Sequence, residues 1–184
     1  NGFFLDFADA NNFGLDAAGP AIGTTTYRYL KIDTTDVEST TYVGVGELEF
    51  FVGATLYPTQ TMTANDAPSP LVASANEDSG GSAQLAYNAF DDTPSVSGGS
   101  NWLTQSGTVT GFLKIDLGSG NGIAPSRIGI TAPGTQNRAP RDFTVQGSNN
   151  DSDYTTLATY ASNTTWLDDE KRLWPISNGN NLAD

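Results

Sequence analysis

Two runs near the start of the chain, YRYLKI at residues 27–32 and VGVGELEFFV at residues 43–52, decide the fold. In the first run two tyrosines and a lysine alternate with Arg, Leu and Ile, which is the period-two pattern of a strand. The second run places its two glutamates on one face and a Leu and a Phe on the other. Residues 34–42 between them are polar and predict a turn. Together the two runs predict a β-hairpin.

Further apolar runs with strand character recur along the rest of the chain, separated by turns rich in Gly, Pro, Asn and Ser. We expect strands at residues 3–7, 71–75, 112–117, 126–132, 141–147, 154–160 and 171–176. Only residues 83–90, AQLAYNAF, have helical character. Many short strands with almost no helix predict an all-β sandwich.

The composition excludes several classes of function. With 21 acidic and 8 basic residues the net charge is −13, so the chain lacks the basic surface that nucleic acids and anionic membranes require. It has no Cys and no His, which excludes disulfides, Cys/His zinc sites and catalysis by thiol or imidazole. No apolar run approaches the length of a membrane span. The excess of acidic residues fits a salty extracellular setting. The opening segment NGFFLDFADANNFGLDAAG at 1–19 resembles stretches of phage tail-fibre-like proteins, and this resemblance implies a virion component.

Four segments, in order, carry a resemblance to a known family: NAFD at 88–91, GFLKIDLG at 111–118, NRAPRDFTVQGSN at 137–149 and WLDDEKR at 166–172. They resemble the F5/8 type C domains, which are discoidin-like and galactose-binding-like. This resemblance implies a jelly-roll β-sandwich and a module without catalytic activity.

The order of the segments is unusual for that family, because residues 25–52 resemble strands that normally close the module. Either they end one module and residues 60–176 begin another, or the chain is a circular permutant. Residues 25–52 and 60–176 together have the size of one module, and a sandwich without its closing strands would leave open edges. We therefore expect one permuted sandwich over 25–176, with an N-terminal arm at 1–24 and a C-terminal tail at 177–184.

The resemblance also implies a structural calcium. Its ligands would be the carbonyls of Gly46 and Asn88 together with Glu47, Asp91 and Thr93. A mixture of carboxylate and carbonyl oxygens suits this ion. The alternative is that the Asp-rich stretch after residue 88 is a solvated turn.

A glycan site on loops at one end of the sandwich is the second implication. The candidates are Trp102, Asn137, Arg138 and Arg141, since an aromatic ring stacks on a sugar and Arg or Asn bonds its hydroxyls. Alternatively Trp102 belongs to the core, and the two arginines pair with nearby acids such as Asp142.

Three functions follow as hypotheses. The first is a non-enzymatic virion surface or tail-fibre module that contacts other virion subunits and weakly binds a host cell-surface glycan. The second is a carbohydrate-binding module of a secreted glycoside hydrolase or adhesin. The third is a purely structural assembly or decoration protein with no ligand.

Overall fold

A computed structural model describes residues 25–79, 84–93 and 100–176 of the chain. The strands are β1 (Tyr29–Val37), β2 (Gly44–Val45), β3 (Glu47–Val52), β4 (Thr55–Tyr57), β5 (Val72–Ala75), β6 (Trp102–Leu103), β7 (Gly111–Asp116), β8 (Arg127–Thr131), β9 (Pro140–Ser148), β10 (Thr155–Tyr160) and β11 (Lys171–Pro175). Two short 3₁₀ turns, η2 (Ala86–Ala89) and η3 (Gln136–Arg138), interrupt them.

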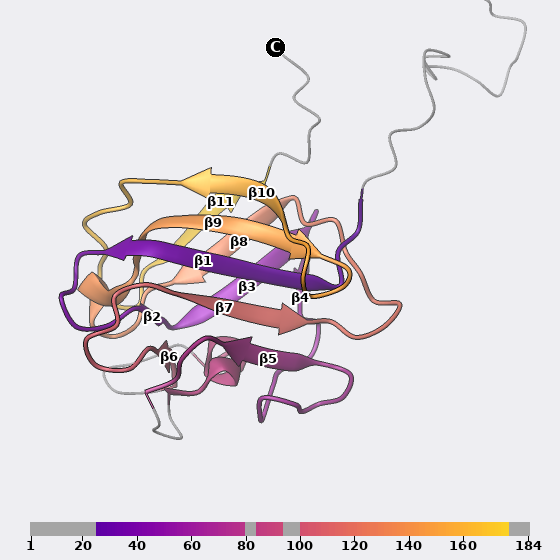
Figure 1. The fold of residues 1–184 in the computed structure, drawn as a ribbon, viewed down its shortest axis with the longest axis horizontal. Coiled ribbons are helices and arrows are strands. Elements are labelled where there is room, and N and C mark those ends of the chain that lie inside the picture. The colour runs from indigo at the N-terminus through magenta and orange to yellow at the C-terminus, as the bar shows by residue number, and fades with distance from the viewer. Residues whose placement is uncertain (1–24, 80–83, 94–99, 177–184) are drawn as a thin grey trace, which may run out of the picture.

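The strands form two antiparallel sheets that face each other (Figure 1). One sheet has the order β10-β9-β1-β7-β5 and the other β11-β8-β3-β4, while β2 and β6 make a separate two-stranded pair. The predicted all-β sandwich is therefore confirmed. No helix in the described ranges is long and apolar enough to cross a membrane.

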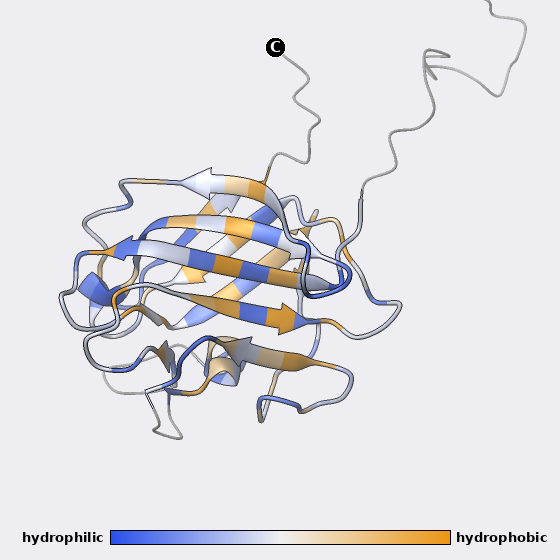
Figure 2. Ribbon diagram, viewed as in Figure 1, coloured by the Kyte–Doolittle hydropathy of each residue, from blue (hydrophilic) through white to orange (hydrophobic). Residues whose placement is uncertain are grey.

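The core lies between the two sheets and is built from alternating strand residues. Leu30 and Ile32 of β1 are fully buried, and Leu48 and Phe50 of β3 face them from the other sheet. Figure 2 shows the resulting alternation of hydrophobic and hydrophilic residues along these strands. Burying each such side chain contributes roughly 1.5–3 kcal/mol, so the alternation fixes which face of each strand turns inward.

The predicted hairpin of residues 25–52 is wrong. β1 lies between β7 and β9 in the five-stranded sheet, and β3 lies between β8 and β4 in the other sheet. Both hydrogen-bonding edges of β1 are thus already occupied, so β3 cannot pair with it. The chain between them crosses from one sheet to the other. The two runs still belong to the same core as the later strands.

The predicted polar turn at 34–42 is also partly wrong, because β1 continues to Val37. Thr34 and Val37 are buried and pair with β9, opposite Phe143 and Pro140. The register with β9 shifts between Thr34 and Val37, and this irregularity lets both side chains turn inward although they lie three positions apart.

Other boundaries differ in detail. The run 43–52 divides into β2 and β3 at Gly46, where a side chain would lie 2.9 Å from the carbonyl oxygen of Ala132. The helical character expected at 83–90 amounts, in its described part, to the single turn η2. The strand expected at 3–7, the N-terminal arm and the C-terminal tail lie outside the described residues.

Loops 38–43, 76–79, 104–110 and 133–139 meet at one end of the sandwich, and we call this end the rim. Hydrogen bonds between backbone groups hold it together. Ser39 N–H donates to the Asn137 carbonyl at 2.7 Å, and Gly107 N–H donates to the Thr41 carbonyl at 2.8 Å. Ser79 N–H donates to the carbonyl of Leu103 in β6 at 2.9 Å. Because these bonds join segments far apart in sequence, the rim is one connected surface.

Candidate functional site

A pair of carboxylates meets where β3 begins beside the turn that follows η2. Glu47 is the first residue of β3, and Asp91 lies in that turn. The backbone N–H of Thr93 donates to Glu47 Oε1 at 2.7 Å and to Asp91 Oδ1 at 2.9 Å. The structure therefore brings together three of the residues expected to hold calcium, although more than forty positions separate the first from the others.

Asn88 joins the same cluster through Ser100. The Ser100 hydroxyl donates to Asp91 Oδ2, and Asn88 Nδ2 donates to the Ser100 hydroxyl oxygen. Asn88 is 3% exposed, yet its Oδ1 has no hydrogen-bond partner among the residues that the structure describes. A buried carbonyl-type oxygen without a partner is costly unless something donates to it or coordinates it.

Glu47 is the most strongly perturbed acid of this cluster. Burial and, after it, the neighbouring negative charge of Asp91 raise its pKa, the Thr93 N–H bond lowers it, and the net result is a pKa of about 8. The two carboxyls are therefore close and without a cation from the described part of the chain, and Glu47 is buried whereas Asp91 is partly exposed. A divalent cation would replace the shared proton and remove the repulsion between them.

The donor set fits calcium better than a transition metal. The described residues contain no group of three or more His, Cys, Asp or Glu that could hold a metal ion. The ligands would instead be the carboxylates of Glu47 and Asp91 with neutral oxygens such as Asn88 Oδ1, a mixture that calcium accepts.

The backbone at Gly46 and at Asp92 helps to shape the expected calcium site. Gly46 N–H bonds the Thr131 carbonyl at 2.8 Å, which fixes the chain just before Glu47. Asp92 has a φ of 52°, in the left-handed region that glycine prefers. The family resemblance implies a Gly at this position, and Asp is one of the few other residues that tolerates the conformation.

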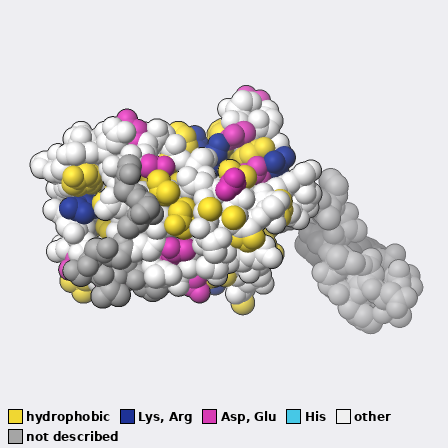
Figure 3. All heavy atoms as spheres, turned by 90° about the horizontal axis from the view of Figure 1, so that it is seen from below, with side chains coloured by type: hydrophobic (Ala, Val, Ile, Leu, Met, Phe, Trp, Pro, Cys, Tyr) yellow, Lys and Arg dark blue, Asp and Glu magenta, His cyan; other side chains and the backbone are white. Residues whose placement is uncertain are grey.

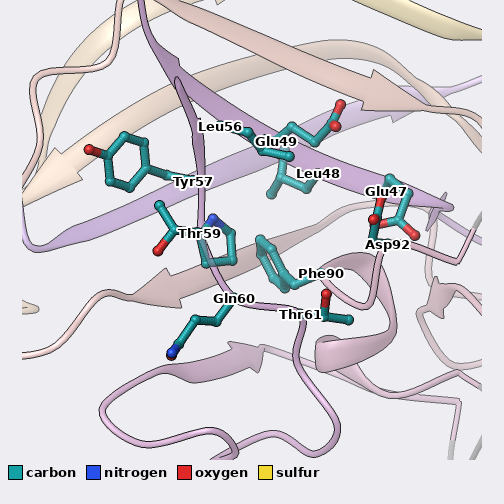
Figure 4. Close-up of a pocket in the computed structure, with 11 residues that line it drawn as sticks. Glu47, Leu48, Glu49, Leu56, Tyr57, Thr59, Gln60, Thr61, Phe90 and Asp92 are labelled. Atoms are coloured by element: carbon teal, nitrogen blue, oxygen red, sulfur yellow. The ribbon is translucent and has the colours of Figure 1, made fainter. Parts of the chain in front are cut away.

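A cavity of about 230 Å³ extends from this cluster along β3 and β4. Figure 4 shows Glu47 and Asp92 together at one end of it and Tyr57 at the other, with Phe90 between them. Glu49, also in its wall, is ion-paired with Lys171 of β11. The two glutamates of β3 therefore differ, since within the described ranges Glu49 is paired with a cation and Glu47 is not.

The structure separates the four residues expected to bind a glycan. Trp102 is fully buried in the core, and its indole N–H donates to the Glu77 carbonyl at 3.0 Å. Its ring offers no exposed face to a sugar. This placement matches the alternative interpretation, in which the Trp serves the core.

Arg141 is also engaged by the chain. It forms an ion pair with Asp36 of β1, whereas Asp142 accepts the N–H of Ser162 at 2.7 Å. The arginine thus has an acidic partner, but a different one from the neighbour expected from the sequence.

Asn137 and Arg138 remain together in η3 at the rim. Asn137 is exposed, and the Arg138 guanidinium lies over the ring of Tyr42, 4.7 Å from its centroid. A cavity of about 290 Å³ adjoins this pair. It is lined by Tyr42, Ser79, Gln84, Leu103, Ser106 and Arg138. This rim pocket combines a cation, an aromatic ring, hydroxyls and an amide.

Tyr42 and Ser100 are site residues that sequence reasoning missed. Tyr42 is an aromatic residue in a stretch expected to be a polar turn, and that exception was a usable signal. Ser100 reaches Asp91 only through tertiary structure, so nothing in the sequence marked it.

Figure 3 shows the side of the molecule below the β5 edge, where acidic side chains are spread among uncharged ones and basic side chains are few.

Comparisons of the chain with family models, with curated proteins and with solved structures find no match.

Proposed function

We propose that this chain is a non-enzymatic structural module of a virion surface or tail fibre that makes weak contact with host glycans at its rim. The observation that carries the glycan contact is the rim pocket beside Arg138 and Tyr42. A guanidinium, hydroxyls and an amide converge there on a cavity of about 290 Å³, the size of one sugar residue or slightly more.

A structural calcium is the second part of the proposal. Glu47 and Asp91 would hold it, with Asn88 supplying a neutral oxygen and Thr93 and Gly46 shaping the turn. Bound there, the ion would neutralise two carboxylates and tie β3 to the turn after η2. Its role would be stability, because Glu47 is buried.

The proposal of a non-enzymatic module is supported by the state of the acids. Both carboxyls of the Glu47–Asp91 pair accept the Thr93 N–H, and Asp91 also accepts the Ser100 hydroxyl, so hydrogen bonds within the fold engage these acids. At the rim pocket itself, the lining residues include no acid and no nucleophile activated by a base.

The relationship of this sandwich to the discoidin-like family is also a proposal. We infer a permuted, discoidin-like jelly roll, in which residues 25–52 close the sandwich made by residues 60–176. The strand order supports it: β1 lies between β9 and β7, and β3 pairs with β8. Sandwich termini lie at the surface, where permutation is tolerated.

A glycan array read at low and at high salt tests the function. We expect weak binding that changes little with salt, because few side chains converge and little charge is neutralised. Strong binding to sulfated polymers that collapses with salt would contradict the proposal.

Two alternative functions make different predictions for the same assay. A carbohydrate-binding module of a secreted hydrolase or adhesin would bind a polysaccharide of its substrate class in the same assay. A purely structural assembly protein is favoured by the burial of Trp102, which removes the expected stacking platform. It predicts no glycan binding by folded protein and assembly with other subunits.

A further inference from the structure

Arg138 differs from most of the basic residues in this acidic chain. Five of the eight basic residues form ion pairs with carboxylates: Arg28, Lys114, Arg141, Lys171 and Arg172. Arg127 donates to the Gly53 carbonyl at 2.9 Å, and Lys31 Nζ lies over the Tyr154 ring, 4.1 Å from its centroid. The Arg138 side chain, by contrast, has neither an ion pair nor a hydrogen bond to any residue within the described ranges, although the chain has 21 acids.

The position of Arg138 is nevertheless fixed. Its backbone N–H donates to the Thr135 carbonyl at 3.1 Å, and its guanidinium packs over the Tyr42 ring. The ring contact restrains the long side chain, so less conformational entropy is lost when the N–H groups find an acceptor. A guanidinium whose N–H groups have no acceptor among the described residues is suited to one ligand group above others, a carboxylate held by two parallel hydrogen bonds.

The surroundings indicate what carries that carboxylate. Ser79, Gln84 and Ser106 line the same pocket with hydroxyl and amide groups, which match the hydroxyls of a sugar. The Ser79 hydroxyl donates to Gln84 Oε1, which leaves the Gln84 NH₂ group and the Ser106 hydroxyl to meet a ligand. The net charge of −13 repels a polyanion, whereas a single carboxylate meets one local cation. A sugar residue with one carboxylate therefore fits better than a sulfated polymer.

We propose that the rim pocket binds an oligosaccharide through one carboxylated sugar, a uronic or sialic acid residue, with its carboxylate on Arg138. This inference rests on the proposed glycan contact and names its ligand class. Arg138 supplies the charge and the paired hydrogen bonds, and Tyr42 holds the guanidinium in place.

The test compares matched sugars that differ in the carboxylate. Binding to methyl glucuronoside and methyl glucoside, and to sialyllactose and its methyl ester, is measured by NMR titration of the full chain. We expect the acidic member of at least one pair to bind about tenfold more tightly than its neutral partner. The pair that responds distinguishes a uronic from a sialic acid.

Variants assign the preference to the residue. Arg138→Gln should abolish it, and Arg138→Lys should retain only part of it because an ammonium lacks the planar fork. Arg127→Gln is the matched control, since Arg127 also lies over an aromatic ring, 5.1 Å from the centroid of Phe51. Its preference for the acidic sugar should stay unchanged. Melting temperatures confirm that each variant is folded.

The possible failures are distinguishable. Equal binding of acidic and neutral sugars would overturn this inference and leave the proposed glycan contact standing. A preference that persists in folded Arg138→Gln would also overturn it. No binding of any sugar would overturn both the inference and the glycan contact.

Discussion

Acidic side chains lie both on the outer face of the five-stranded sheet and in the cluster around Glu47, but their pKa values shift in opposite directions. On the sheet face, Lys114 Nζ donates to both oxygens of Asp151 at 2.6 and 2.7 Å. Burial there favours the neutral acid, but hydrogen bonds from Lys114 and Tyr154 outweigh it and hold the pKa of Asp151 below its ordinary value. At the start of β3, Glu47 meets Asp91 instead of a cation, and its pKa rises to about 8.

On the sheet face, basic side chains of the protein pair with the acids. In the Glu47 cluster, no described basic side chain does so. Asp116 on the same sheet face is likewise paired, with two bonds of 2.7 Å from Arg28. A buried carboxyl pair without a cation costs stability, and such local costs are typical of sites that a ligand completes. Arg138 at the rim is the converse case, a basic side chain without a carboxylate partner among the described residues.

The largest expected effect comes from calcium. If the ion binds the folded chain at Glu47 and Asp91, a thousandfold excess over its dissociation constant stabilises the fold by about 4 kcal/mol. For a chain of this size that raises the melting temperature by roughly 10 °C. Calorimetry before and after chelation measures it. An unchanged melting temperature, in a sample shown by metal analysis to start with calcium, would remove calcium from the proposal.

The second effect is the pH dependence of the metal-free protein. Because the folded pKa of Glu47, about 8, lies above its unfolded value of 4.5, the folded state holds an extra proton between these values. Stability therefore falls as the pH rises through this window, on the order of 3 kcal/mol. Glu47→Gln keeps the oxygen that accepts from Thr93 N–H but removes the charge, so this fall should disappear.

Urea denaturation from about pH 5 to pH 8 in the presence of chelator checks the prediction. The same variant should also lose any stabilisation by added calcium. A fall in stability of equal size in Glu47→Gln would show that other groups cause it, and would contradict the assignment of the raised pKa.

The strands were predictable from sequence because their signal is local. Residues 112–117, for example, are read as a strand from their own pattern, and β7 spans Gly111–Asp116. The partner of a strand is not a local property. The hairpin prediction failed for this reason. The residues between β1 and β3 look like a turn whether the two strands pair with each other or the chain crosses from one sheet to the other.

The candidate sites were predictable only in part. Asp91 and Thr93 were expected near Glu47 through the family resemblance, and the structure places them in contact. For Trp102 the sequence left two interpretations, a sugar platform and a core residue, and its burial confirms the second. Exposure depends on what packs against a side chain, which here includes the loop carrying Glu77. The lack of an acidic partner for Arg138 among the described residues was equally invisible, since it depends on where the acids lie in the fold.

The smallest expected effect is on the sheet face, where the charge balance is already complete. Replacing Lys114 by Met removes the ion pair with Asp151, which is more than a third exposed, so the loss should be about 0.5 kcal/mol. The lowered pKa of Asp151 sets the pH dependence: the contribution is present above the unfolded pKa of 3.8 and is lost as the pH falls through the folded value. The stabilities of wild type and Lys114→Met should therefore differ at neutral pH and converge in acid, whereas Glu47→Gln should differ from wild type most at high pH. Asp151→Asn and the double variant complete a thermodynamic cycle that isolates the pair. If the Lys114→Met difference instead grew in acid, or exceeded the effect of Glu47→Gln, the sheet face and not the Glu47 cluster would be the region with incomplete charge balance.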